Sequence, residues 1–586
     1  MSIVTARPPA DRELRPVAGA REDPGRILRL ASFLTVVVLL GPVAAGLAGT
    51  FAPAIGYMPA IGGINVEIAP FRELLERPGF WTSVRVSLAT GLGATVLSFT
   101  LVVLLCAGWQ DTGAFRAIVR VLSPLLSVPH AAVAFGLAFL VAPSGWIVRM
   151  ISPWATGWSR PPDVLIVQDP WGLTLLAGLV TKEVPFLLLM TVAAIGQTEA
   201  TRGIAIARSL GYGRVAGWLK VVFPRVYPQI RLPVYAVLAY STSVVDVAMI
   251  LGPSTPSTLA VQIVRWSNDP DLSLRMLAAA GAVAQLLVTL GALGLWLVME
   301  NALARIGRLW IEGGRRGRRD LLLRSVGLGG VALAVASVTL GLAALALWSV
   351  SGLWMFPDAL PEGLTLRHWD QFVPAFQSAI NETLVIAAAA AAVSFGLATA
   401  CLEAEHRRGT RPGNGGLWML YTPLVVPQIA FLLGLQAFML ATGIDGGRTG
   451  VIFAHVVFVF PYVFLSFADQ YRSWDTRYGM VARALGAGPN RVFWAVRLPM
   501  LAVPALTALA VGFAVSVGLY LPTLLIGAGR VATLTSEAVA LASGGDRRLI
   551  GVVALAQTGA AFVAFAAAAA VPMVIRVINR HSGSGR

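Results

Sequence analysis

The segment Ala207-Arg-Ser-Leu-Gly-Tyr-Gly213 returns 275 residues later as Ala482-Arg-Ala-Leu-Gly-Ala-Gly488. The same offset pairs Arg202 with Arg477. No gap interrupts this match between residues 202 and 252, so chance is a poor explanation for it. The chain is therefore predicted to consist of two related halves that arose by duplication.

Both copies of this segment lie in a very apolar chain. Of its 586 residues, 56% are hydrophobic and only 13% are charged, and the mean hydropathy is +0.74. A soluble chain of this length would need far more charge to cover its surface. The apolar residues form blocks of about 20, the length of a helix that crosses a bilayer core of about 30 Å. The sequence predicts an all-α integral membrane protein with about twelve transmembrane helices, at 30–49, 82–106, 119–142, 172–197, 228–251, 277–300, 326–349, 378–401, 416–440, 449–467, 500–524 and 549–575.

The basic residues predict how the chain is oriented. The net charge is +16, but most of the 45 Lys and Arg residues lie in short segments between apolar blocks, on the side of the N-terminus. This bias marks the cytoplasmic side of a membrane protein and argues against a nucleic-acid partner. Both termini are expected in the cytoplasm, and the two halves form a parallel repeat. The predicted parts are a basic cytoplasmic tail (1–29), a first six-helix half (30–304), a basic cytoplasmic linker (305–325), a second six-helix half (326–576) and a cytoplasmic tail (577–586).

Two predicted cytoplasmic loops, 198–227 and 473–499, hold the repeated segment and are long for simple connections. In the first loop, a short amphipathic helix is expected to end at Gly211, because glycine readily takes the left-handed conformation after a helix. A second short helix is expected to break before Pro224. A helix, a glycine corner and a second helix would form a rigid knob that suits a groove on a partner.

The first loop carries a specific resemblance. Glu199 and Ala200, followed by Gly211 and then Pro224 before the next span, are similar to the EAA loop of ABC importer permeases. In that family the loop docks into a cleft of a cytoplasmic ATPase and transmits its nucleotide-driven closure. The alternative is a structural turn that duplication has merely repeated.

The second loop matches the EAA pattern less well. Gly486 and Pro499 match, but Trp474 and Asp475 stand where Glu and Ala belong. Asp475 is the candidate replacement for the missing glutamate. The two loops are therefore expected to contact their ATPase subunits unequally.

The whole chain resembles the fused, two-in-one permeases of the iron(III), thiamine and polyamine/sulfate importers. Segments 246–253 and 544–551 are most similar to the thiamine-type branch. This resemblance implies a permease of the bacterial cytoplasmic membrane with two cytoplasmic ATPase subunits and an external substrate-binding protein. Thiamine or iron(III) would be the solute.

The chain itself is not expected to be an enzyme or to hold a cofactor. A P-loop needs Gly-Lys-Ser/Thr, whereas the only two lysines, Lys182 and Lys220, follow Thr181 and Leu219. Any ATPase must then be a separate polypeptide, and the five histidines lack metal-binding spacing. The competing class is a secondary transporter driven by an ion gradient, which can also have two parallel halves. A membrane enzyme or assembly factor is a third alternative.

Several polar residues inside predicted spans are candidates for the translocation path. Lys182, Glu183 and Asp246 are charged, and charges at membrane depth usually face a cavity or a partner. An ion pair between Lys182 and Asp246 is expected, and structural pairing and path lining both remain open. His130 and Gln428 each follow a proline at equivalent places, where they would line the central interface or cap backbone groups freed by that proline.

Overall fold

The structure is a computed structural model that describes residues 25–409, 413–444 and 446–583. All regular secondary structure in these ranges is helical, which confirms the predicted all-α class. Nearly all of the predicted N-terminal tail and the last three residues of the C-terminal tail lie outside the described residues.

The helices follow one another as in the predicted halves. The first half contains α1 (Gly25–Ala54), η1 (Pro59–Ile61), α2 (Ala69–Glu76), α3 (Phe80–Trp109), α4 (Gly113–Leu125), α5 (His130–Val141), α6 (Trp146–Ile151), α7 (Leu173–Gly196), α8 (Ala200–Ser209), α9 (Arg214–Val221), α10 (Phe223–Ser243), α11 (Asp246–Leu251), α12 (Leu259–Ser267) and α13 (Leu274–Glu312). The second half contains α14 (Leu321–Ser349), α15 (Arg367–Arg408), α16 (Asn414–Val425), α17 (Gln428–Ala441), α18 (Arg448–Arg472), α19 (Arg477–Ala484), α20 (Pro489–Val492), the π-helical segment η2 (Phe493–Arg497), α21 (Leu498–Met500), α22 (Ala502–Gly518), α23 (Leu521–Gly527), α24 (Leu534–Leu541) and α25 (Arg547–Gly583).

The number of membrane helices agrees with the prediction of about twelve. Within the described residues, nine helical segments are long and apolar enough to cross a membrane. Two strongly bent helix pairs bring the number to eleven: α16 with α17 bends by 83°, and α20–α21 with α22 bends by 75°. The remaining predicted block, 228–251, is divided between α10 and α11.

Four predicted spans are interrupted, and the interruptions are equivalent in the two halves. The block at 119–142 breaks before Pro129 and the block at 416–440 breaks before Pro427, since proline disfavours helical backbone in the residue that precedes it. The later breaks lie at Val244 and Leu519, which are extended (ψ 139° and 120°) and are related by the same offset of 275 residues. Interrupted membrane helices at matching places of two repeats are typical of transporter binding sites.

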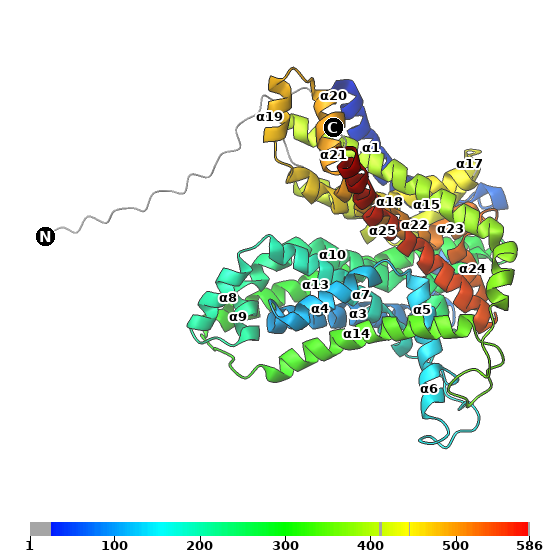
Figure 1. The fold of residues 1–586 in the computed structure, drawn as a ribbon. Coiled ribbons are helices and arrows are strands. Elements are labelled where there is room, and N and C mark those ends of the chain that lie inside the picture. The colour runs from blue at the N-terminus through cyan, green and yellow to red at the C-terminus, as the bar shows by residue number, and fades with distance from the viewer. Residues whose placement is uncertain (1–24, 410–412, 445, 584–586) are drawn as a thin grey trace.

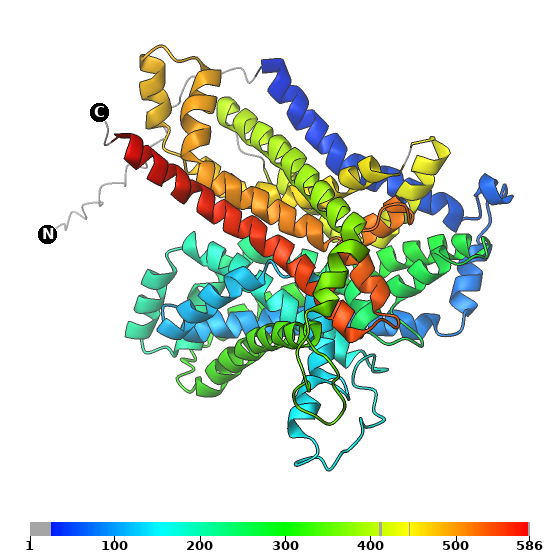
Figure 2. The ribbon, with the colours of Figure 1, turned by 45° about the vertical axis from the view of Figure 1, so that its right-hand side comes forward.

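Each half lends its first helix to the other half. In Figures 1 and 2, α1 runs along α17 within the bundle of the second half, and α14 runs along α3 and α5 of the first half. Small residues allow this close approach. A Cβ atom on Gly434 of α17 would lie 1.9 Å from the Gly46 carbonyl oxygen of α1, and the Gly434 N–H donates to the Thr50 hydroxyl at 3.0 Å. The exchange ties both halves into one unit.

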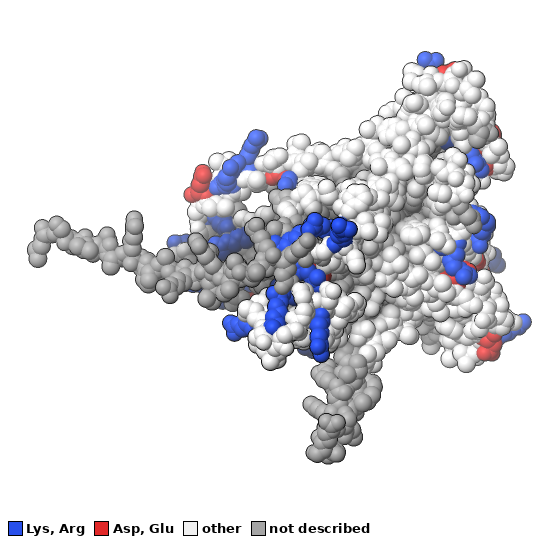
Figure 3. Space-filling model, turned by 90° about the horizontal axis from the view of Figure 1, so that it is seen from above, with Lys and Arg blue, Asp and Glu red and all other residues white. Residues whose placement is uncertain are grey.

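The two bundles meet near α5 and α23 and diverge towards the ends that carry α8 and α9 on one arm and α19 and α20 on the other (Figure 1). Lys and Arg side chains gather towards two ends of the face in Figure 3, and the surface between them is almost free of charge. An uncharged band between charged ends is the surface that a bilayer requires.

We predict that Gly434→Ala destabilises the purified chain by roughly 1–3 kcal/mol, because the new methyl group would overlap the α1 backbone. Gly396→Ala on α15 is the matched control, since a Cβ atom there meets nothing within 4 Å. Thermal unfolding in detergent should show a lower Tm for Gly434→Ala alone. Equal Tm values for the two variants would contradict the tight crossing of α1 and α17.

Candidate functional site

The first loop has the helix, glycine corner and helix that its sequence predicts. Helix α8 ends at Ser209, Gly211 takes a left-handed φ of +82°, and α9 follows. Pro224 lies in the first turn of α10, where its missing N–H costs no helical hydrogen bond. The corner turns the chain by local backbone geometry and then returns it to the membrane.

The motif residues of the first loop divide into an exposed and a buried group. The Glu199 side chain is 75% exposed, and its carboxylate lies 3.8 Å from the Arg202 guanidinium. Ala200 is buried and packs into the loop. An open groove of about 450 Å³ is lined by α8, α9 and Ile311 at the end of α13, and Glu199 stands at this groove. Its carboxylate is therefore available to a partner.

The second loop repeats the backbone plan. Helix α19 leads to Gly486, with a left-handed φ of +85°, and the chain continues through α20 and η2. Pro499 lies in the short helix α21. The two corners are thus the same structural element.

Trp474 and Asp475 do not replace the Glu-Ala pair in kind. Trp474 is buried, and the Arg497 guanidinium lies 4.5 Å from its ring centroid. Asp475 is half exposed and accepts a hydrogen bond from the Arg477 N–H at 3.0 Å. Its carboxylate serves its own turn and offers less to a partner than Glu199 does.

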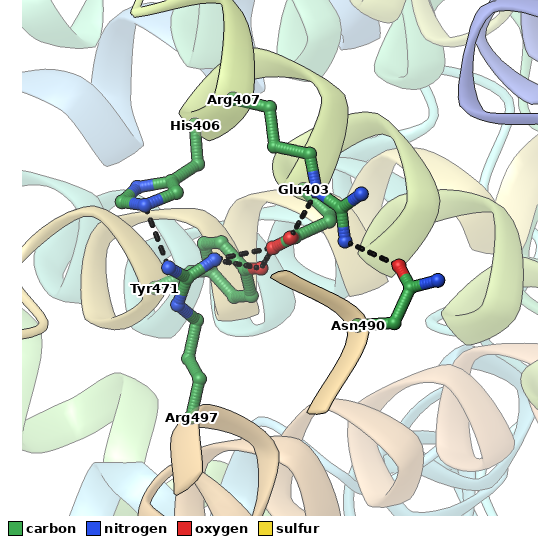
Figure 4. Close-up of polar contacts among 6 residues, drawn as sticks. All are labelled: Glu403, His406, Arg407, Tyr471, Asn490 and Arg497. Carbon is green, nitrogen blue, oxygen red and sulfur yellow. Dashed lines mark hydrogen bonds and ion pairs between the residues drawn. The ribbon is translucent and has the colours of Figure 1, made fainter. Parts of the chain in front are cut away.

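A buried charge network holds the second loop to the membrane helices (Figure 4). The Glu403 carboxylate of α15 accepts hydrogen bonds from Arg407 (2.7 Å), from the Tyr471 hydroxyl and from Arg497. Arg407 also donates to the Asn490 side chain of α20 at 3.0 Å. Glu403 and Arg497 are only 4% and 2% exposed. Movement of α20 and η2 would therefore pull on α15 and α18.

Sequence reasoning missed this network. The available signal was weak: Glu403 lies just beyond the predicted span 378–401, and Arg497 lies two residues before Pro499. At the offset of 275 residues, Val222 takes the place of Arg497 in the first half. The first half therefore needs a different anchor.

The charged candidates in the membrane are placed differently from the prediction. The Lys182 ammonium donates to the carbonyl oxygens of Leu126 (2.9 Å) and Val128, at the break between α4 and α5. The expected ion pair with Asp246 is wrong. A helix interrupted by proline leaves carbonyl groups without N–H partners, and Lys182 satisfies two of them.

Two buried carboxylates remain near the meeting point of the halves. Glu183 lies in the middle of α7, within electrostatic range of Tyr240 and of Tyr462 from the second half. Asp246 is the first residue of α11, where backbone amides bind its carboxylate, and it lies near Tyr520. Carboxylates from the first half and tyrosines from both halves thus share one region.

The two residues that follow the prolines begin the second helix of each broken span. His130 is the first residue of α5, and its ring centroid lies 4.9 Å from that of Tyr240. Within the described residues, its Nδ1 atom has no hydrogen-bond partner. Gln428 is the first residue of α17. Since Lys182 caps the freed carbonyls, capping by His130 is not what these contacts favour.

We predict that Arg497→Met destabilises the chain by about 3–5 kcal/mol, because it leaves Glu403 buried without its guanidinium partner. Glu403→Gln combined with Arg497→Met should cost less than the sum of the single changes. Arg448→Met is the control: its ion pair with Glu382 is largely exposed and should contribute about 0–1 kcal/mol. Unfolding in mixed micelles measures all four variants, and strict additivity would argue against the contact.

Comparison with known proteins agrees with this architecture. The family described as binding-protein-dependent transport system inner membrane component matches residues 392–582. The inner membrane ABC transporter permease protein YnjC of Escherichia coli (strain K12) is 31% identical over 488 residues, covering 82% of this chain and 85% of that relative.

Shorter relatives match a single part of the chain. The putrescine transport system permease protein PotI of Escherichia coli (strain K12) is 33% identical over 141 residues, which is 22% of this chain and 49% of PotI. The spermidine/putrescine transport system permease protein PotC of Haemophilus influenzae is 30% identical over 134 residues, 22% of this chain and 51% of PotC. With the near full-length match to YnjC, these similarities show that the chain belongs to the ABC transporter permeases, as an inner membrane component of a binding-protein-dependent transport system.

Proposed function

We propose that this chain forms the whole membrane pathway of an ATP-driven importer, with both permease halves in one polypeptide. The observation that carries the proposal is the duplicated helix–glycine corner–helix between α7 and α10 and between α18 and α22. Each corner would bind one cytoplasmic ATPase subunit, so one chain would bind two. Closure of the ATPase pair would draw the two arms together and switch access across the membrane.

The proposed orientation follows from the same loops. Both loops are rich in arginine and would face the cytoplasm, which places both termini there as well. An external binding protein would deliver the solute on the opposite face. ATP hydrolysis would occur on the ATPase subunits, and the permease would not be an enzyme.

We propose an organic cation as the solute. Glu183 and Asp246 supply carboxylates, and Tyr240, Tyr462 and Tyr520 supply aromatic faces and hydroxyl groups near the meeting point of the halves. Carboxylates attract cations, and aromatic faces stabilise ammonium groups. The names of the shorter relatives favour a polyamine over the thiamine or iron(III) that the sequence resemblance suggests.

Transport in proteoliposomes tests the proposal. With its ATPase and binding protein, the chain should accumulate labelled putrescine only when ATP is present, and an ion gradient alone should drive none. Glu183→Gln should lower putrescine uptake roughly tenfold, because the conservative change removes the negative charge and keeps the shape. Gradient-driven uptake without the ATPase would instead identify a secondary transporter.

The solute class has its own readout in the same vesicles. Thiamine and iron(III) are offered separately at equal concentration, each with the binding protein that retains it. Uptake of iron(III) that Glu183→Gln leaves unchanged would exclude the organic cation and leave the ATP-driven importer standing.

We predict that Glu199→Ala weakens ATPase binding more than Asp475→Ala does. Glu199 is the more exposed carboxylate, whereas Asp475 is partly engaged by the Arg477 N–H. Loss of a charge-assisted hydrogen bond across an interface should weaken binding about tenfold or more. Retention of the ATPase by each variant, at matched membrane levels, measures the difference; equal losses would mean that the two loops dock equivalently.

A further inference from the structure

The connection between α13 and α14 folds back onto the glycine corner of the first loop. The Gly213 N–H donates to the Arg316 carbonyl oxygen at 2.9 Å. The Val215 N–H, in the first turn of α9, donates to the Asp320 carboxylate at 3.0 Å. Amides in a first helical turn have no acceptor within their own helix, so Asp320 supplies one from 105 residues away in the chain. Residues 313–320, here called the strap, are thus bonded to the loop.

The second loop offers an internal comparison for the strap. A Cβ atom on Gly213 would lie 2.1 Å from the Gly317 carbonyl oxygen, whereas one on Gly488, the equivalent residue, meets nothing within 4 Å. A Cβ atom on Gly211 would lie 3.1 Å from the Arg318 guanidinium, and one on Gly486 again meets nothing within that distance. The strap therefore covers one of two otherwise equivalent corners.

The end of α13 continues the strap into the groove of the first loop. The Lys220 ammonium of α9 donates to the Trp310 carbonyl oxygen at 2.9 Å and lies 4.5 Å from the Trp310 ring centroid. Ile311 lines the same groove as Glu199. The strap and the groove are consequently one continuous surface.

This surface is strongly basic. Arg315, Arg316, Arg318 and Arg319 are all exposed, while Asp320 is buried beneath them and used by the Val215 amide. Arg318 also donates to the Gly211 carbonyl oxygen at 3.3 Å. Four exposed arginines beside an exposed docking groove fit a partner that presents carboxylates at the rim of its cleft.

We propose that the strap is part of the docking surface for the first ATPase subunit. It would hold the first corner rigid and add arginine contacts to an acidic rim of that subunit, which the second corner lacks. This inference rests on the proposed function, because it assumes an ATPase at the first loop. The linker between the halves would then be a docking element as well as a tether.

The first experiment needs no partner. Amide hydrogen exchange is measured on the full chain in lipid nanodiscs. The Val215 amide should exchange at least tenfold more slowly than that of Asn490, its equivalent in α20, and Asp320→Ala should remove the difference. Asp546→Ala, at an exposed acidic side chain, is the control that should leave it intact. Equal exchange at both corners of the unaltered chain would overturn the strap.

The second experiment measures docking. The ATPase subunit that copurifies with the chain from its native membranes is identified, produced separately and titrated onto the full chain in nanodiscs. Arg315→Gln with Arg319→Gln should weaken its binding about three- to tenfold at low salt, and the difference should shrink at 0.5 M salt. Neither side chain bonds to the loop in the described structure, so the strap itself should remain. Arg72→Gln with Arg275→Gln, two exposed arginines on the opposite face, is the matched control.

The outcomes separate the inference from the function on which it rests. Binding by the strap variant that equals the control at every salt concentration would overturn the docking role while ATPase binding to the unaltered chain still supported the importer. An unaltered chain that binds no ATPase would overturn the importer and the docking role together.

Discussion

Backbone polar groups cannot be left unpaired in a bilayer, and the rest of this structure depends on how that constraint is met. Four membrane helices are interrupted, and each interruption exposes carbonyl or amide groups. At the break before Pro129, the Lys182 ammonium satisfies two carbonyl groups. The breaks are tolerated because they lie inside protein, where the exchanged helices α1 and α14 help to enclose them. A path for polar solutes can then form at the same places.

The two halves share a backbone plan but anchor their loops in different ways. The second loop is held from within the membrane domain by the Glu403–Arg497 network, whose charges are buried together. The first loop has Val222 at the place of Arg497 and is held from outside by the strap. Duplication preserved the glycine corners, since their left-handed backbone has few substitutes, while the supports diverged.

Much of the fold and part of the site could be predicted from the sequence. Helix content, the approximate number of spans and the glycine corners depend on local patterns, which a single sequence displays. The Lys182–Asp246 pair was wrong because charge counting ignores backbone carbonyls, and these become partners only where a helix breaks. The strap and the Glu403–Arg497 contact were missed because they join residues about a hundred positions apart, such as Val215 with Asp320, through folded geometry alone.

Fusion of the two halves changes what the loops can do. In two separate permease chains, the sixth span of one half would end freely, and no connection would reach the neighbouring loop. Here α13 must lead to α14, and α14 must cross to pack on α3 and α5 within the first half. The short connection 313–320 is thereby held beside α9, close enough for Asp320 to bond the Val215 amide. The exchange of first helices, which the membrane domain needs for its packing, thus also delivers a basic strap to the first docking corner. An asymmetric coupling surface follows from the covalent connection itself.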